Sequence, residues 1–394
     1  MSSPDGATRR VPFLMIAAFF FVFLGPAAIQ LYVKNVVPAG WSSMQVTSIL
    51  AVLYFSFMFW RFLIVPSQHF LSDKWALAFG ALGYVVLPLA LLFTVNYVFL
   101  LAVTCLWGWS SAALWQTGPV WLYDTTNPRR RGLWTGILYS LVFVGYYAGA
   151  RILGRAAQAG NPRLILILAI LPGALAFACA AMLPRRKARS QKLSLGATLH
   201  MLFDRRVSIM GFLLFVSATS YGLLLGSFRD KIQASYGAEA VGVIVGYSLV
   251  VRMLVSGIGG HFGDVLARRT VVATVFLIGG VALATATQLE EYWAFSVASA
   301  CLGLVGCTAP VSATAYCGDW FEPQKRSLAM AASFFWQDFG MVASLLGGQY
   351  IAQMSGGFKA PFIVFAAVFL FSAGVAFVLP GGASATETAA VAEE

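Results

Sequence analysis

The chain has 394 residues, of which 59% are hydrophobic and only 10% are charged, and its formal net charge is +11. Soluble globular proteins are about half apolar and about a quarter charged, so this composition excludes a soluble domain and predicts a protein that crosses a membrane many times. In a protein this apolar, the basic excess is typical of cytoplasmic membrane loops and not of a nucleic-acid-binding surface.

Apolar stretches long enough to cross a bilayer recur along the chain. A transmembrane helix needs about 20 mostly apolar residues. Six such helices are predicted in the first half, near 11–33, 44–66, 75–95, 97–123, 132–154 and 163–184. After a polar stretch, six more are predicted near 207–228, 240–260, 270–288, 292–318, 327–352 and 360–379. The predicted fold class is therefore an all-α membrane protein with twelve transmembrane helices.

The lysines and arginines predict the orientation. With both termini inside, the cytoplasmic segments hold seventeen of these residues and the outside segments seven, among them Arg229 and Lys231. Because cytoplasmic loops carry the positive excess, we expect cytoplasmic tails at 1–10 and 381–394. A basic cytoplasmic linker at 185–206 then joins bundles at 11–184 and 207–380. The lack of long loops and of N-x-S/T acceptors favours the inner membrane of a prokaryote, with lipid and no nucleic acid as partner, and we expect a monomer.

Features of the first half recur in the second. Arg61 precedes Asp73 by twelve residues, and Arg252 precedes Asp264 by the same interval. The segments "DTTNPRRRGL", from Asp124, and "DWFEPQKRSL" align at a constant offset of 195 residues. Transporter folds are often built from duplicated halves. We therefore expect two pseudo-symmetric six-helix bundles, related by an axis along the membrane normal.

The segment "GHFGDVLARR", which begins at Gly260, resembles the cytoplasmic loop motif of the major facilitator superfamily. In this motif an acid at a helix end pairs with basic residues across a loop, and such contacts break when the bundles change orientation. The resemblance implies a cytoplasmic gate; topology determination alone is the alternative. The residues assigned to the gate motifs are Asp73, Lys74, Asp264, Arg268, Arg269, Asp124, Arg131, Asp319 and Arg326.

Residues 50–125 resemble one branch of this superfamily more closely. The stretches "LYFSFMFW", "KWALAFGALGYVV" and "GWSSAALWQTGPVWLY" are similar to helices two, three and four of the Unc-ninety-three-like branch. The resemblance implies the twelve-helix major facilitator fold. Members of this branch include regulators of potassium channels and a trafficking chaperone of innate-immune receptors, so a function other than transport stays open.

Three charged residues fall well inside predicted spans, away from their ends. Arg61 and Arg252 each precede the loop motif by eight residues, which places them roughly 12 Å inside the membrane. Asp338 is the only acid clearly within a predicted span, at a similar depth. The arginines could instead extend to the headgroups. We favour a central polar cavity in which Arg252, together with Arg61, binds an anionic group of the substrate, and in which Arg61 can pair with Asp338. Asp338 is also the candidate carrier of a coupled proton, and a structural salt bridge is the alternative for it.

Other polar and aromatic residues are candidates for the same cavity. The superfamily resemblance implies that helices one, four, seven and ten line the pathway, which favours Gln30 and Gln116. Trp115, Trp336 and Gln337 are weaker candidates. For the two tryptophans the reason is that tryptophans more often pack or anchor at the membrane interface. The glycines of "GYYAGARILG" suit a close approach of helices across the interface between the bundles.

The favoured function is a secondary active transporter that moves a small anionic or zwitterionic organic substrate by alternating access, with possible proton coupling. The alternative is a transport-inactive regulator or chaperone of other membrane proteins. No P-loop, catalytic triad or metal-ligand spacing occurs in the sequence, so we expect neither an enzyme nor a metal or cofactor.

Overall fold

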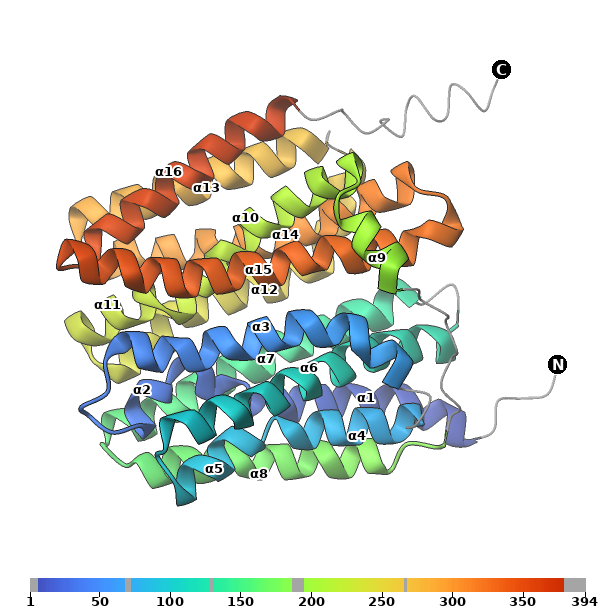
Figure 1. The fold of residues 1–394 in the computed structure, drawn as a ribbon, viewed down its shortest axis with the longest axis horizontal. Coiled ribbons are helices and arrows are strands. Elements are labelled where there is room, and N and C mark those ends of the chain that lie inside the picture. Colours follow the sequence, from blue (N-terminus) through green and yellow to red (C-terminus); the bar gives the residue numbers. More distant parts are fainter. Residues whose placement is uncertain (1–5, 68–71, 128–130, 186–194, 266–267, 379–394) are drawn as a thin grey trace. The chain divides into compact units, whose positions relative to one another are not determined.

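The computed structural model describes residues 6–67, 72–127, 131–185, 195–265 and 268–378, and every element in these ranges is a helix (Figure 1). Most of the predicted tails and residues 186–194 of the predicted linker lie outside the described residues. The part of the linker that is described contains a short helix, α9 (Leu195–Leu202), which the sequence analysis did not predict.

The chain divides into two compact units. The first comprises Met1–Ser194 together with Ile232–Gly246, and the second comprises Leu195–Lys231 together with Tyr247–Glu394. The helices before the linker are α1 (Gly6–Leu24), the 3-10 turn η1 (Ala28–Leu31), α2 (Val33–Val36), α3 (Ser43–Ser67), α4 (Asp73–Gly83), α5 (Val86–Phe93), α6 (Tyr97–Thr125), α7 (Arg131–Gln158) and α8 (Pro162–Ala181).

The helices after α9 complete the second half of the sequence. They are α10 (Arg205–Leu225), α11 (Ser227–Tyr236), α12 (Ala238–Val265), α13 (Arg268–Leu289), α14 (Tyr292–Trp320), α15 (Pro323–Ser355) and α16 (Lys359–Val378). Of these, α11 and α12 each contribute residues to both units, because the boundaries fall after Lys231 and after Gly246.

Eleven described segments are long and apolar enough to cross a membrane. They correspond to eleven of the twelve predicted spans. The twelfth position is filled by α15, a helix of 33 residues. It is less apolar than the others because it carries Gln337, Asp338 and Gln349. The predicted class, an all-α membrane protein with twelve transmembrane helices, is confirmed.

The internal repeat is visible in how each unit packs. In the first unit, α1 packs on α7, and α4 packs on both α6 and α8. In the second unit, α10 packs on α15, and α13 packs on both α14 and α16. These helices occupy the same places in the two halves of the sequence. These three pairings therefore recur in both halves, in agreement with the repeated motifs.

The first helix of each half is interrupted, which the hydrophobic pattern did not show. α1 ends at Leu24, just before Gly25 and Pro26, and proline cannot continue a helix without losing a hydrogen bond. α10 ends at Leu225, and after Gly226 the chain continues as α11 to Tyr236. The seventh span is therefore longer than the predicted 207–228.

Close helix contacts in the first unit depend on glycines of α7. A Cβ at Gly145 would lie 2.6 Å from the carbonyl oxygen of Phe20, and a Cβ at Gly149 would collide with the carbonyl oxygen of Leu24. Both carbonyls belong to α1 and are one helical turn apart. These two glycines bring α7 against α1 inside one unit, where small residues permit close backbone approach. The prediction that the glycines of this segment serve the interface between the bundles stays a prediction.

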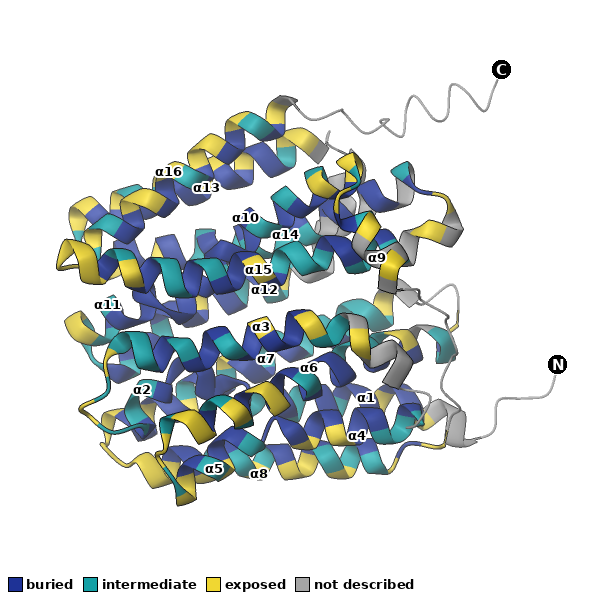
Figure 2. Ribbon diagram, viewed as in Figure 1, coloured by how far each residue is buried: buried dark blue, intermediate teal, exposed yellow. Residues whose placement is uncertain are grey.

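Exposed residues, drawn in yellow, recur along α8 (Figure 2). On α8 the exposed residues Leu164, Ile167, Leu171 and Leu175 recur every three or four positions. This spacing places them on one face of the helix. A continuous exposed apolar stripe is unfavourable in water but suits a face that contacts lipid.

Candidate functional site

Arg252 of α12 lies inside the second unit, with 8% of its surface exposed. Its guanidinium carbon is 4.7 Å from the centroid of the Tyr221 ring on α10. A guanidinium at this distance from an aromatic ring is attracted by the π electrons. The ring therefore stabilises the positive charge at a place where water is largely excluded.

Gly306 of α14 forms another side of the Arg252 environment. A Cβ at this position would collide with Nη2 of Arg252, and it would lie 2.7 Å from Cζ of Arg252 and 3.1 Å from Oγ of Ser220. The guanidinium therefore occupies the space that a side chain at 306 would fill. Cys307, the next residue, is half-buried and lies near enough to interact electrostatically with Arg252.

Close packing of α10, α12 and α14 holds these residues in place. The Ser217 hydroxyl of α10 donates a hydrogen bond to the carbonyl oxygen of Val305 at 2.8 Å. A Cβ at Gly303 would lie 2.5 Å from the carbonyl oxygen of Ser248 on α12. Because these contacts involve backbone atoms, the relative positions of the three helices around Arg252 are well defined.

Asp338 lies on α15 of the same unit and is 2% exposed. Its neighbour Trp336 packs against α10, since a Cβ at Gly211 would collide with the indole ring. Within the described part of the chain, the buried Nε1 of Trp336 and the buried Oε1 of Gln337 have no hydrogen-bond partner. Buried polar atoms are normally satisfied, so this stretch of α15 keeps unused hydrogen-bonding capacity.

Arg61 lies in the first unit, on α3, and is half-buried. Its guanidinium carbon is 4.2 Å from the centroid of the Phe57 ring, one turn earlier on the same helix. Both repeat-related arginines thus cover an aromatic ring. Arg61 and Asp338 belong to different units, and their pairing stays a prediction.

The other candidates of the first unit are held by polar and aromatic contacts. Gln30 is buried, and its Oε1 accepts a 2.6 Å hydrogen bond from the Tyr54 hydroxyl. Trp115 stacks on Tyr139 with ring centroids 5.8 Å apart, and it also meets Phe19 and Phe23 edge-on. Gln116 is half-buried.

The structure describes only part of the predicted gate motifs. Asp73 is buried in the first turn of α4, Lys74 lies over the Trp75 ring at 5.5 Å, Asp124 is half-buried near the end of α6, and Arg269 is exposed on α13. The side chains of the remaining gate residues lie outside the described part; they are Asp264, Arg268, Arg131, Asp319 and Arg326. The gate role stays a prediction.

The sequence analysis missed a buried charge cluster on α11. Asp230 accepts hydrogen bonds from Nη2 of Arg229 at 2.8 Å and from Nε2 of Gln349 on α15 at 2.7 Å. All three residues are at most 1% exposed. Placing Arg229 in an outside loop was wrong, as was the view that Asp338 is the only acid in a span, because the seventh span continues to Tyr236. The adjacent opposite charges just after an apolar run were the available signal.

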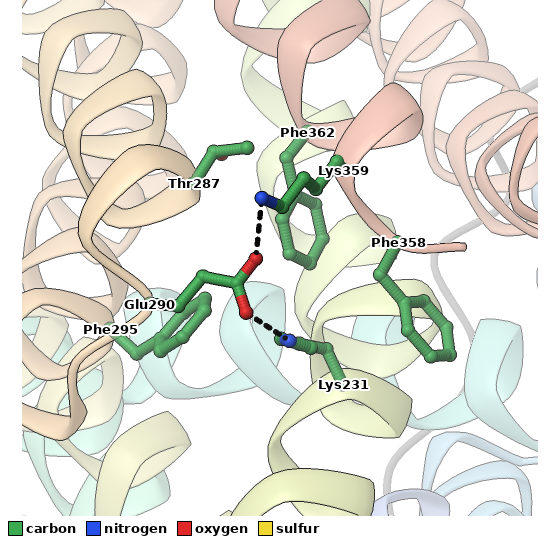
Figure 3. A pocket seen from close by; sticks show the side chains of 7 residues that line it. All are labelled: Lys231, Thr287, Glu290, Phe295, Phe358, Lys359 and Phe362. Carbon is green, nitrogen blue, oxygen red and sulfur yellow. Dashed lines mark hydrogen bonds and ion pairs between the residues drawn. The ribbon is translucent and has the colours of Figure 1, made fainter.

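A shallow pocket lies at the turn between α13 and α14 (Figure 3). Glu290 in this turn bonds the amino groups of Lys231 and Lys359, each at 3.0 Å. Hydrogen bonds from Lys231 and then Lys359 lower the pKa of the Glu290 carboxyl below its ordinary value. The free volume is about 10 Å³, roughly what one water molecule needs. This pocket is too small for an organic substrate.

Two repeated six-helix halves with charged residues inside the spans define a class of protein: a polytopic helical membrane protein with the architecture of secondary transporters. A family model of the Major Facilitator Superfamily matches residues 11–244 and 207–393. The chain therefore belongs to the major facilitator superfamily. The resemblance to the Unc-ninety-three-like branch is not tested by this match and stays a prediction.

Solved structures show the same fold. The crystal structure of an aspartate-to-alanine mutant of the nucleoside transporter NupG is 13% identical in sequence, with a TM-score of 0.71 over 93% of this chain and 100% of that chain. The crystal structure of NupG itself is 12% identical, with a TM-score of 0.69 over 95% of this chain and 100% of that chain. No curated protein matches the sequence. Sequence identities this low support the shared fold, but they do not identify a substrate for this chain.

Proposed function

We propose that this protein is a secondary active transporter that moves a small anionic or zwitterionic organic substrate across the cell membrane by alternating access. The observation that carries the proposal is the buried position of Arg252, in a span, against Tyr221 and Gly306. A charge at mid-membrane costs on the order of 3 kcal/mol or more and is commonly kept for function. Family membership supports the transport class.

The guanidinium of Arg252 suits an oxyanion. It offers a planar set of N–H donors that match a carboxylate or phosphate in a bidentate arrangement. The low exposure of Arg252 argues against a side chain that extends along lipid to the headgroups. We assign Arg252 the role of the anion anchor, with Arg61 as its repeat-related counterpart in the other unit.

We further propose that Asp338 carries a coupled proton. It is buried on α15, beside Trp336 and Gln337, and within the described residues Nε1 of Trp336 and Oε1 of Gln337 have no hydrogen-bond partner. Ionisable residues at such positions commonly serve as proton relays. The wider setting of the proposal is a monomer in a prokaryotic inner membrane, with both termini in the cytoplasm, as the basic loop residues indicate.

A thermal-shift screen of the purified protein tests the anion anchor. We expect at least one compound in a panel of organic anions, zwitterions, sugars and nucleosides to raise the melting temperature of the wild type, because ligand binding stabilises the folded state. The shift should disappear in Arg252→Ala and shrink strongly in Arg252→Lys, which keeps the charge but loses the planar fork.

A matched control for this screen is Arg155→Ala, which removes an exposed arginine. Its shift should equal that of the wild type. An anion that stabilises Arg252→Ala as strongly as the wild type would remove Arg252 from the binding site.

A further inference from the structure

The residues around Arg252 form a set that none of the sequence motifs singled out. We call it the Arg252 cluster: Arg252 of α12, Ser220 and Tyr221 of α10, and Gly306 and Cys307 of α14. Three helices contribute to it, and the guanidinium has an aromatic ring on one side and the α14 backbone at Gly306 on another.

We propose that Gly306 and Tyr221 are positioning residues that fix the plane of the Arg252 guanidinium, so that its N–H groups present a preformed fork to a carboxylate or phosphate oxyanion. This inference rests on the proposed function of Arg252 as anion anchor. A fork held in one orientation loses less side-chain entropy when the anion binds. Gly306 provides the space for Nη2, and the Tyr221 ring stabilises the charge against that surface.

A substitution at Gly306 can change the position of the Arg252 guanidinium without disturbing folding. The atom that a Cβ at 306 would meet is Nη2 of Arg252, the end of a flexible side chain. Gly306→Ala should therefore fold normally, because the guanidinium can move away. Gly303, less than one turn earlier on α14, is different: a Cβ there would meet the Ser248 backbone, with the carbonyl oxygen at 2.5 Å. Gly303→Ala should disturb the packing of α14 on α12 next to Arg252, so it is expected to affect both folding and the position of the guanidinium.

Cys307 provides a reporter that needs no substrate. Its thiol is half-buried and interacts electrostatically with Arg252. In a protein whose other four cysteines (Cys105, Cys179, Cys301 and Cys317) are alanine, Cys307 can be treated with charged methanethiosulfonates. The thiolate forms a mixed disulfide with the reagent, and methanesulfinate leaves. The modification rate of Cys307 is measured with the anionic sulfonatoethyl reagent and with the cationic trimethylammonium-ethyl reagent. Each rate is divided by the rate of the same reagent with a free thiol in solution, and the ratio of the two normalised rates reports the electrostatic potential at Cys307.

We expect the anionic reagent to react faster than the cationic one by on the order of tenfold, since a single charge within several ångströms changes local concentrations by such factors. Arg252→Ala should bring the ratio of the anionic to the cationic rate close to one. Gly306→Ala should lower it several-fold while the melting temperature stays near that of the single-cysteine parent. Tyr221→Leu should lower it too, whereas Tyr221→Phe, which keeps the ring, should retain it.

Two control variants complete the experiment. Gly280→Ala should lower the melting temperature and keep the ratio, since a Cβ at 280 on α13 would meet Leu370 and the carbonyl oxygen of Ala366 on α16, neither of which belongs to the Arg252 cluster. Gly374→Ala should change neither, since among the described residues nothing lies within 4 Å of a Cβ at 374 on α16. A ratio in Gly306→Ala equal to that of the parent would overturn the proposal, as would a Cys307 that reacts with neither reagent.

The result is independent of transport. If the ratios behave as expected and no organic anion shifts the melting temperature, the Arg252 cluster is preorganised as proposed and the proposed function is wrong. If an anion binds through Arg252 and Gly306→Ala changes neither its affinity nor the reagent ratio, the positioning role is wrong and the function stands.

Discussion

Buried charged side chains are the basis of the proposed function at the residue scale. Arg252 and Asp338 both lie in the second unit with at most 8% of their surfaces exposed. A charge removed from water this far needs compensation from rings, dipoles or opposite charges. The Tyr221 ring provides part of it for Arg252.

The role of Asp338 as proton carrier predicts a specific loss. With a substrate from the screen, Asp338→Asn should still exchange substrate across a proteoliposome membrane, because a neutral side chain mimics the protonated form. Uphill uptake driven by a pH gradient should be abolished. Gln353→Asn, at an exposed position of the same helix, should retain uphill uptake. If Asp338→Asn still accumulates substrate to the wild-type level when a pH gradient is applied, proton coupling belongs to another residue.

Sequence patterns found some of these residues and not others. Arg252 and Asp338 stand out because each charge interrupts a long apolar run. Arg252 stands out further because its interval of twelve residues to Asp264 repeats the interval from Arg61 to Asp73. Gly306 and Tyr221 could not be found in this way: a glycine and a tyrosine are ordinary in a membrane helix, and only the three-dimensional packing brings them to the guanidinium.

At the scale of elements, the interrupted helix formed by α10 and α11 differs most from expectation. The apolar run predicted a span that ends near 228, since Arg229 and Asp230 look like the start of a polar loop. Instead the two charges neutralise each other inside the unit, and Gln349 ties Asp230 to α15. Hydropathy scores each charge separately, so it cannot predict a buried pair.

The anchoring of α11 predicts a large effect on stability. Asp230→Asn removes the carboxylate from a pair whose side chains have 0% exposure, and breaking a buried ion pair typically costs about 3–5 kcal/mol. The melting temperature in detergent should fall by many degrees. The double replacement of Arg229 by Met and Asp230 by Leu should recover part of the loss, because apolar residues can replace a buried pair.

Glu239→Gln is the matched control on an exposed ion pair. Glu239 lies 3.9 Å from Arg151 and 3.7 Å from Arg155, with 44% of its side chain exposed. Exposed pairs contribute about 0–1 kcal/mol, so the melting temperature should barely change. A similar small effect for Asp230→Asn would mean that α11 is held by its apolar contacts instead.

At the scale of the whole molecule, the twelve helices and their duplication follow from the sequence with few errors. The solvent of the protein is lipid, so every span needs a long apolar run and a helix that satisfies its own backbone. Both halves are subject to this constraint, and three pairs of packed helices recur in both units. The proposed function depends instead on a few polar side chains, which is why the fold was more predictable than the site.

Exchange of an identified anion in proteoliposomes tests the account most directly. Liposomes that contain the protein and a high internal concentration of the anion are diluted into its radiolabelled form, without any ion gradient. Wild-type protein should accumulate label transiently, as expected for alternating access, and Arg252→Ala should match protein-free liposomes. Saturable binding without any exchange by the wild type, or equal exchange by Arg252→Ala, would contradict the account.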